Sequence, residues 1–325
     1  MIRKVQVFLV VLCILSLMAG TALAQGKADP NRRLKTRTAV ATALALGQPS
    51  LIHPPLNTKA VSAPIPITTQ LGYQASLQLG GLYYPSGIGV SWRGDTILFA
   101  QDEGSGNVYW HHDHIIDAIP TPTSYLHAAR ERGAFYVGSY YGEVYKVVDR
   151  QYVSLRGWDE YGDDIAALDV DLATGTVYFT TNYYDGGYGE YWTGLYALPK
   201  NTSSAILMDW WWDEPCWGIA VKGNFLYITD YYNDSIWKYP KQVQYGPWLE
   251  FVFGLDGPTD ICFDKLGNMF VAEWGGGSIA RVKAGSYNIV RIASGLISPY
   301  YLQLDGSDNI YFTDYDMGAI WKLKK

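Results

Sequence analysis

The sequence predicts an all-β fold, a six-bladed β-propeller of four-stranded blades. Three observations indicate it. A triplet of an aromatic or aliphatic, an apolar and a small residue recurs six times at intervals of 38 to 49 residues. A second apolar strand follows each triplet after a polar turn, and an apolar segment precedes it. The segment before the first unit also matches the end of the fifth unit, so the two ends of the chain are expected to complete one blade.

The triplets are the second strands of the blades, because aromatic and β-branched residues favour strands. They lie at Leu98–Ala100, Tyr136–Gly138, Tyr178–Thr180, Tyr227–Thr229, Phe270–Ala272 and Tyr311–Thr313. The third strands lie at Val108–Trp110, Val144–Lys146, Leu195–Ala197, Ile236–Lys238, Ile279–Arg281 and Ile320–Lys322. Proline opens most of the innermost strands, where its missing N–H removes no ladder hydrogen bond; these prolines are Pro85, Pro122, Pro215, Pro258 and Pro299.

The last unit contains only three strands before the sequence stops at Lys325. The segment Ala75–Pro85 matches Val290–Pro299, which is the fourth strand and exit of the fifth unit. We therefore expect the N-terminal strand to complete the last blade and to remove its exposed edge.

The first 69 residues are expected to lie outside the propeller, which spans residues 70–325. Residues 1–24 have a basic start, an apolar run and Ala22-Leu23-Ala24 before Gln25, as in a secretory signal. An uncleaved membrane anchor is the alternative. Residues 25–69 are rich in Pro, Ala and Thr and are expected to form a flexible leader. The signal sequence predicts export to the periplasm, the cell surface or the medium. Cys216 and Cys262 are expected to be free thiols.

The charge distribution disfavours a nucleic-acid partner. The whole chain has a net charge of −6, but residues 75–325 carry 17 basic and 30 acidic side chains. Phosphates need a basic face, which this composition does not supply.

The segment Pro258–Lys283 resembles a blade of the gluconolactonase-like proteins, in the wider group of NHL-type and strictosidine-synthase-like six-bladed propellers. The resemblance implies a divalent metal held by Glu, Asn and Asp at the starts of innermost strands. At the matching Asp and Asn positions this chain has Thr259 and Trp217, and no Glu flanks Pro85. The catalytic histidines of streptogramin-lyase-like propellers are also not matched: His111, His112 and His114 fall on a predicted outer turn, and His127 is expected in the core.

The residues directly after the six triplets invite interpretation as a ring of ligands. They are Gln101, Ser139, Thr181, Asp230, Glu273 and Asp314. Short acceptor side chains at such positions usually cap the following turn by accepting its backbone N–H groups. We expect that role here.

Aromatic and acidic side chains gather in the loops that enter the innermost strands and in the turns between second and third strands. So many aromatic residues at one end of a propeller predict a contact surface. The expected ligand-binding residues are Trp158, Tyr184, Trp192, Trp211, Trp217, Tyr232, Trp274 and Tyr301. Asp163, Asp164, Glu214 and Asp260 are candidates to hold one Ca²⁺ or another divalent metal ion. The long turn Asn182–Gly194 is expected to form a glycine-hinged flap over this end.

These features favour a non-catalytic, exported binding module for a glycan, a peptide or a partner protein. No catalytic residue is predicted. Two alternatives remain at this point: a gluconolactonase-like or lyase-like metal-dependent enzyme with a divergent site, and a structural subunit of a surface assembly.

Overall fold

The computed structural model describes residues 66–101, 107–120, 128–131, 133–139, 141–156, 164–185, 190–212 and 216–325. All regular secondary structure in these ranges is β-strand. None of the described residues forms a helix that could cross a membrane. The predicted all-β class is confirmed.

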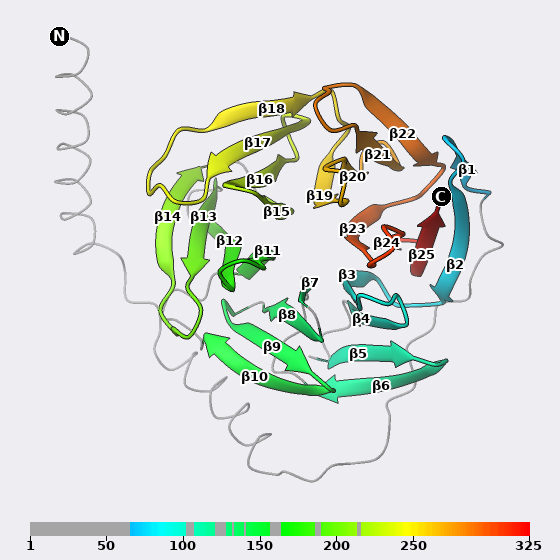
Figure 1. Ribbon diagram of the computed structural model, residues 1–325, viewed down its shortest axis with the longest axis horizontal. Helices are drawn as coiled ribbons and strands as arrows, with labels where there is room; N and C mark the ends of the chain where they lie inside the picture. Colours follow the sequence, from blue (N-terminus) through cyan, green and yellow to red (C-terminus); the bar gives the residue numbers. More distant parts are fainter. Residues whose placement is uncertain are drawn as a thin grey trace, which may run out of the picture. The chain divides into compact units, whose positions relative to one another are not determined.

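The strands form six antiparallel sheets arranged as the blades of a propeller (Figure 1). The innermost strands are β3 (Pro85–Val90), β7 (Ala128–Glu131), β11 (Asp164–Asp171), β15 (Ile219–Lys222), β19 (Pro258–Phe263) and β23 (Pro299–Leu304). The second strands are β4 (Thr96–Gln101), β8 (Ala134–Gly138), β12 (Thr176–Asp185), β16 (Phe225–Asp230), β20 (Met269–Glu273) and β24 (Ile310–Asp314). Each of the six triplets found in the sequence lies in one of these second strands.

The third and fourth strands form the outer half of each blade. The third strands are β5 (Asn107–His112), β9 (Val144–Val148), β13 (Glu190–Leu198), β17 (Ser235–Pro240), β21 (Ser278–Val282) and β25 (Ala319–Lys324). The fourth strands of the first five blades are β6 (Ile115–Pro120), β10 (Gln151–Arg156), β14 (Ile206–Trp212), β18 (Leu249–Phe253) and β22 (Ile289–Ser294).

The sixth blade takes its outer strand from the N-terminal side of the propeller, as predicted. The strand β2 (Gln74–Gly80) pairs with β25, from Gln74 opposite Lys324 to Gly80 opposite Ala319. The short strand β1 (Thr68–Thr69), at the end of the expected leader, pairs with β22 and gives the fifth blade a fifth strand. The chain before the first blade therefore spans the outer edges of blades five and six.

The hydrophobic core lies between neighbouring blades rather than in one central mass. Phe270 of blade five packs in one cluster with Leu302 and Phe312 of blade six, and all three are buried. Burial of each such side chain contributes about 1.5–3 kcal/mol. Cys216 and Cys262 are free thiols, as predicted, and burial raises the pKa of Cys216 to about 12.

The connections into blades one, five and six share the pattern Gly-Leu-x-x-Pro. Their glycines, Gly81, Gly254 and Gly295, have φ angles of 73°, 78° and 83°, which a side chain would disfavour. The leucine that follows is buried and donates its N–H to the turn between second and third strands: Leu82 to Gly318 O (2.8 Å), Leu255 to Asp234 O (3.1 Å) and Leu296 to Gly277 O (3.0 Å).

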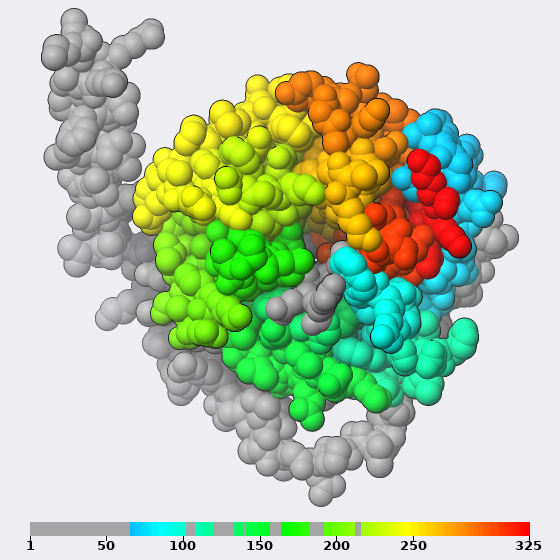
Figure 2. All heavy atoms as spheres, in the orientation of Figure 1, coloured from blue at the N-terminus to red at the C-terminus, as the bar shows by residue number. Residues whose placement is uncertain are grey.

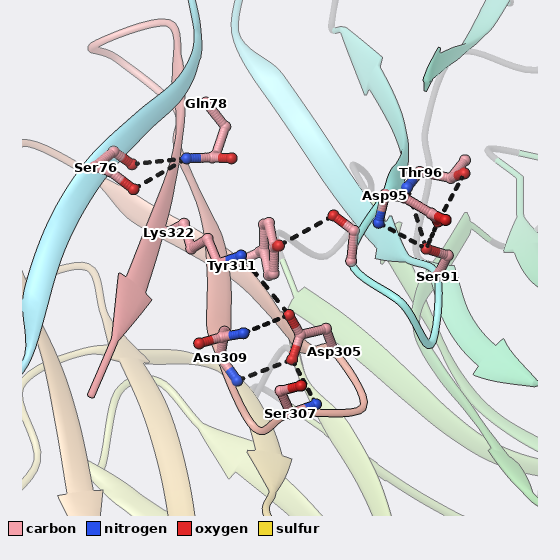
Figure 3. A network of polar contacts seen from close by, with 11 residues as sticks. Ser76, Gln78, Ser91, Asp95, Thr96, Asp305, Ser307, Asn309, Tyr311 and Lys322 are labelled. Carbon is pink, nitrogen blue, oxygen red and sulfur yellow. Dashed lines mark hydrogen bonds and ion pairs between the residues drawn. The ribbon is translucent and has the colours of Figure 1, made fainter. Parts of the chain in front are cut away.

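The turns between first and second strands lie at the other end of the blades and have their own polar network (Figure 3). Asp305 accepts the N–H groups of Ser307 and Asn309 at 2.8 and 3.0 Å and the side-chain amide of Asn309 at 2.6 Å. The Tyr311 hydroxyl donates to Gly94 O at 3.2 Å, which joins blade six to blade one. This network closes the ring at that end.

Candidate ligand-binding face

We call one end of the propeller the entry face; it is made of the loops that enter the innermost strands and the turns between second and third strands. Backbone hydrogen bonds bring these two loop sets together. Trp274 in a turn donates to Gly257 O in an entry loop at 2.9 Å, and Tyr315 donates to Ser298 O at 2.9 Å. The prediction that both sets lie at one end is therefore confirmed for blades five and six.

A continuous series of ring contacts crosses this face, and we call it the aromatic row. Neighbouring ring centroids lie 4.8–6.3 Å apart in the order Trp217, Tyr300, Trp274, Tyr315, Tyr84 and Tyr83. All six side chains are half-buried. Tyr301 is buried beside the row, with its ring 4.3 Å from that of Tyr300. The row thus joins loops of blades four, five, six and one.

Buried acceptor side chains fix the loops that carry the row. The Glu273 carboxylate directly precedes Trp274, has no solvent contact, and accepts two hydrogen bonds of 2.9 Å from Arg291. It also accepts the N–H of Asp256 at 3.1 Å in the entry loop. Asp314, directly before Tyr315, accepts the N–H groups of two entry-loop residues at 3.0 and 2.9 Å.

The expected turn-capping role is confirmed for three of the six residues that follow the triplets, and two others do something related. Ser139, Asp230 and Asp314 accept N–H groups of the turn that follows them, and Asp314 also accepts N–H groups of its entry loop. Gln101 and Glu273 instead accept N–H groups of the loop that enters their own blade. Thr181 is buried within β12. Five of the six side chains are thus bound to backbone N–H groups, whereas the buried Thr181 hydroxyl has no hydrogen-bond partner among the described residues.

Three of the predicted ligand-binding residues belong to the aromatic row or its support: Trp217, Trp274 and Tyr301. Tyr232 is 62% exposed and its ring contacts Tyr231 at 5.3 Å. Of the other four predicted residues, two lie on outer strands of blade three, and the side chains of the other two are outside the described part of the chain.

Trp192 and Trp211 lie on the outer strands of blade three. The Trp192 ring is 6.1 Å from that of Trp210. The Trp211 ring lies 4.9 Å from that of Trp248 and packs against the core between blades three and four. Trp158 lies outside the described residues, and for Tyr184 only the backbone, in β12, is described.

The eight ligand-binding residues expected from the sequence do not include Tyr300, Tyr315 and Tyr84, which connect the rings of the row. Tyr300 contacts four other rings: Trp217, Trp274, Tyr301 and Tyr315. The available signal was positional: Trp274 and Tyr315 each directly follow a buried acid, and Tyr300 directly follows an entry proline. Equivalent positions in neighbouring blades meet at one end of a propeller.

The long turn of blade three is mostly β-ladder rather than an irregular flap. β12 and β13 stay paired to Asp185 opposite Glu190. The four residues between them lie outside the described residues.

Of the metal candidates, the structure describes Asp164 and Asp260, while Asp163 and Glu214 lie outside the described residues. The Asp260 carboxylate accepts the N–H of Ile261 and, in the next blade, the N–H of Leu302, both at 2.8 Å. Burial, with a smaller contribution from Asp169, raises the pKa of Asp260 well above its ordinary value. Within the described ranges, no three His, Cys, Asp or Glu side chains are grouped as a metal site. The predicted metal ion stays a prediction.

The histidine-rich turn lies between β5 and β6 of blade one, as expected from the sequence. His112 Nδ1 lies 2.9 Å from Thr96 Oγ1 and 3.0 Å from Asp95 O. Burial, followed by the neighbouring His114 and His112, lowers the pKa of His111. His127 lies outside the described residues.

A cavity of about 540 Å³ lies along the innermost strands, toward the turns between first and second strands. Its polar lining includes Asp169, Asp260 and Gln303. Lys241 and Asp171, also in the lining, form a buried ion pair of 2.6 Å. Figure 2 shows one face of the molecule, with the blades packed around the central region.

No family model matches the chain, and no curated protein matches it. Solved structures do. A luciferin-regenerating enzyme has a TM-score of 0.64 and 13% identity, covering 78% of this chain and 96% of that protein. The chain shares its fold with such propellers. A gluconolactonase from Xanthomonas campestris has a TM-score of 0.63 and 15% identity over 84% of this chain and 98% of that protein. A streptogramin B lyase has a TM-score of 0.55 and 13% identity, covering 78% of this chain and 97% of that protein.

These likenesses confirm the fold expected from the resemblance of Pro258–Lys283 to gluconolactonase-like blades. At this level of identity they concern the fold alone, because one fold supports many activities.

Proposed function

We propose that this protein is an exported binding module that holds a carbohydrate on its entry face. The observation that carries the proposal is the aromatic row, in which six half-buried rings form one connected surface. Sugars present apolar C–H faces that pack on aromatic rings, and burial of such a ring contributes about 1.5–3 kcal/mol. A peptide or a partner protein is an outcome of the test.

The spacing of the rings favours a ligand that lies on the row over a cation held between rings. The rings of Trp274, Tyr300 and Tyr315 lie 5.0, 5.7 and 5.7 Å from one another. Two ring faces that sandwich a group must be about 7–8 Å apart, because each needs a contact of about 3.5–4 Å. These three rings pack on each other, so their outward surfaces are what a ligand can reach.

Acidic side chains beside the row supply hydrogen-bond acceptors for hydroxyl groups. Asp256 is exposed in the entry loop next to Gly275 and Gly276, which follow Trp274. Asp316 is exposed directly after Tyr315 and accepts a hydrogen bond from Ser298. Apolar rings beside carboxylates match the mixed surface of a sugar.

The test is an oligosaccharide array probed with the protein and with the double variant Trp217→Ala, Trp274→Ala. Trp92→Ala is the matched control, because Trp92 is 41% exposed in a turn between first and second strands, at the other end of the blades. We expect wild type and Trp92→Ala to bind the same glycans and the double variant to lose them. Unchanged binding by a folded double variant contradicts the proposal.

A metal-dependent enzyme is the second candidate, favoured by the structural likeness to a gluconolactonase and a lyase. The candidate ligands are those predicted from the sequence, Asp163, Asp164, Glu214 and Asp260. Metal analysis of the purified protein, with melting in the presence and absence of EDTA, tests it. One tightly held divalent ion whose removal lowers the melting temperature supports this candidate.

Export is part of the proposal and rests on residues 1–24. N-terminal sequencing of the mature protein is expected to begin at Gln25. A chain that retains residues 1–24 in the membrane fraction supports the alternative of an anchor.

A further inference from the structure

Tyr84 has a backbone conformation that tyrosine rarely adopts. Its φ angle is 46°, in the left-handed region, and the next residue is Pro85. A bulky side chain disfavours this region, and a following proline pushes a residue toward extended conformations. Of the ten non-glycine residues with positive φ among those the structure describes, only Tyr84 precedes a proline.

The corresponding residue in blade five is glycine. The connections into blades one, five and six all read Gly-Leu-x-x-Pro, so Tyr84 before Pro85 corresponds to Gly257 before Pro258 and to Ser298 before Pro299, and of these two only Gly257 has a positive φ. Gly257 has a φ of 59°. The loops into blades one and five therefore use the same left-handed position, which glycine fills without strain. A tyrosine there needs a reason in its side chain.

The Tyr84 side chain extends the aromatic row across the junction of blades six and one. Its ring lies 4.9 Å from that of Tyr315 in blade six, at an interplanar angle of 31°, and 4.8 Å from that of Tyr83. The loop is bonded to both blades at this junction. Leu82 donates to Gly318 O of blade six at 2.8 Å, and Tyr83 donates to Gln101 Oε1 of blade one at 2.6 Å. The ring is thus presented from a rigid loop.

We propose that Tyr84 is a ligand-contact residue, and that the ligand is an elongated saccharide whose sugar units pack along the row from Trp217 to the Tyr83–Tyr84 pair. This inference rests on the proposed function. Strained residues that persist in a fold are concentrated at ligand-binding positions. Trp217 and Tyr84 lie toward opposite ends of the series of contacts, so a short saccharide covers only part of it.

The test compares Tyr84→Gly with wild type, with Tyr84→Phe, and with Trp274→Ala as the control for the row itself. The probes are the array-selected oligosaccharide in its longest available form and its monosaccharide or disaccharide. Melting temperature is measured for every variant. Glycine suits the left-handed backbone, so Tyr84→Gly is expected to melt within a few degrees of wild type or higher.

We expect Tyr84→Gly to bind the longest saccharide about ten-fold more weakly, a change of about 1.4 kcal/mol. Binding of the short probe is expected to stay within about two-fold of wild type, and Tyr84→Phe is expected to bind both as wild type does. A purely structural role instead predicts a lower melting temperature for Tyr84→Gly and equal losses for both probes, which overturns the inference.

The remaining outcomes separate this inference from the proposed function. If Trp274→Ala weakens binding while Tyr84→Gly binds the longest saccharide as wild type does, the face is right and Tyr84 is not a contact. If both variants bind as wild type does, the face itself is wrong, and this inference fails with it.

Discussion

Asp169 and Asp260 occupy equivalent places on the innermost strands of blades three and five and make the same contacts. Each carboxylate accepts the N–H of the next residue and the N–H of a residue in the following blade. For Asp169 the second donor is Val221 at 2.7 Å, and for Asp260 it is Leu302 at 2.8 Å. These side chains thus link adjacent blades and fix their register.

The raised pKa of Asp260 makes stability depend on pH. Because its pKa is higher in the folded chain than the unfolded value of about 3.8, the folded state binds the proton more tightly, and this contribution is complete at low pH. It is lost as pH rises through the folded pKa. Asp314, whose pKa burial also raises, acts in the same direction.

We therefore predict that, as pH rises above about 4, the free energy of unfolding of Asp260→Asn falls less steeply than that of wild type. Urea unfolding at several pH values measures both slopes. Equal slopes contradict a raised pKa at this position.

Trp211 is predicted to contribute mainly to stability, and Trp274 mainly to ligand binding. Trp211 packs against Trp248 and the core between blades three and four, so Trp211→Ala is expected to lower stability by about 2–4 kcal/mol. Trp274→Ala is expected to lower it by less and to remove binding. Urea unfolding and binding of the same array-selected saccharide check both. A Trp211→Ala protein that keeps full stability and loses saccharide binding contradicts the structural role of Trp211.

At Tyr84 the free-energy cost of the left-handed backbone can be compared with the gain from the ring contact. A left-handed non-glycine residue costs of the order of 1–3 kcal/mol, and an aromatic pair contributes about 0.5–1.5 kcal/mol. The contact with Tyr315 alone does not clearly offset the strain. No sequence pattern indicates this feature, because Tyr83-Tyr84-Pro85 gives no sign of its φ angle.

At the scale of elements, the strands and their order are readable from the sequence because each blade repeats the same short apolar pattern. The entry-loop bonds of Glu273 and Asp314 are not readable, because a capping residue and a loop anchor look alike in sequence. The same limit explains Trp211, which follows Trp210 on an outer strand. Alternation along a strand does not say which of the two rings enters the core.

The ion pair of Glu273 and Arg291 is predicted to hold the fifth blade's entry loop and Trp274 in place. Glu273 is fully buried, so Arg291→Met leaves an uncompensated buried charge and is expected to cost about 3 kcal/mol of stability. The matched control is Arg150→Met, which breaks the exposed 2.6 Å pair with Asp117 and is expected to cost less than about 1 kcal/mol.

Thermal and urea unfolding of both variants measure this difference. Similar losses in the two variants contradict an anchoring role for Glu273. Arg291→Lys, which keeps the positive charge, is expected to recover part of the stability.

At the scale of the whole molecule, the pairing of β2 with β25 ties the two ends of the propeller together. A chain that begins at Gly72 keeps β2 and is expected to unfold cooperatively. A chain that begins at Gly81 lacks β2, leaves the edge of β25 unpaired, and is expected to lose cooperative unfolding or to aggregate. Near-UV circular dichroism during heating distinguishes them, and equal melting of the two chains contradicts the role of β2.

The ring closure was predictable because the missing fourth strand of the last unit had a sequence match near the start of the propeller. The ligand was not predictable, because a fold shared with a gluconolactonase and a lyase leaves the site open. Trp217, Trp274 and Tyr301 were selected from the sequence by their loop positions. Their connection through Tyr300 required the structure.

The most direct test of the carbohydrate-binding entry face is hydroxyl-radical footprinting with and without the array-selected saccharide. Oxidation is read at single side chains by mass spectrometry. Trp217, Trp274, Tyr300 and Tyr315 are expected to be protected from oxidation. Trp92 and Tyr287, which are 41% and 73% exposed and lie outside the aromatic row, are expected to react as before. Protection of Trp92 with no change at the aromatic row would contradict carbohydrate binding on the entry face.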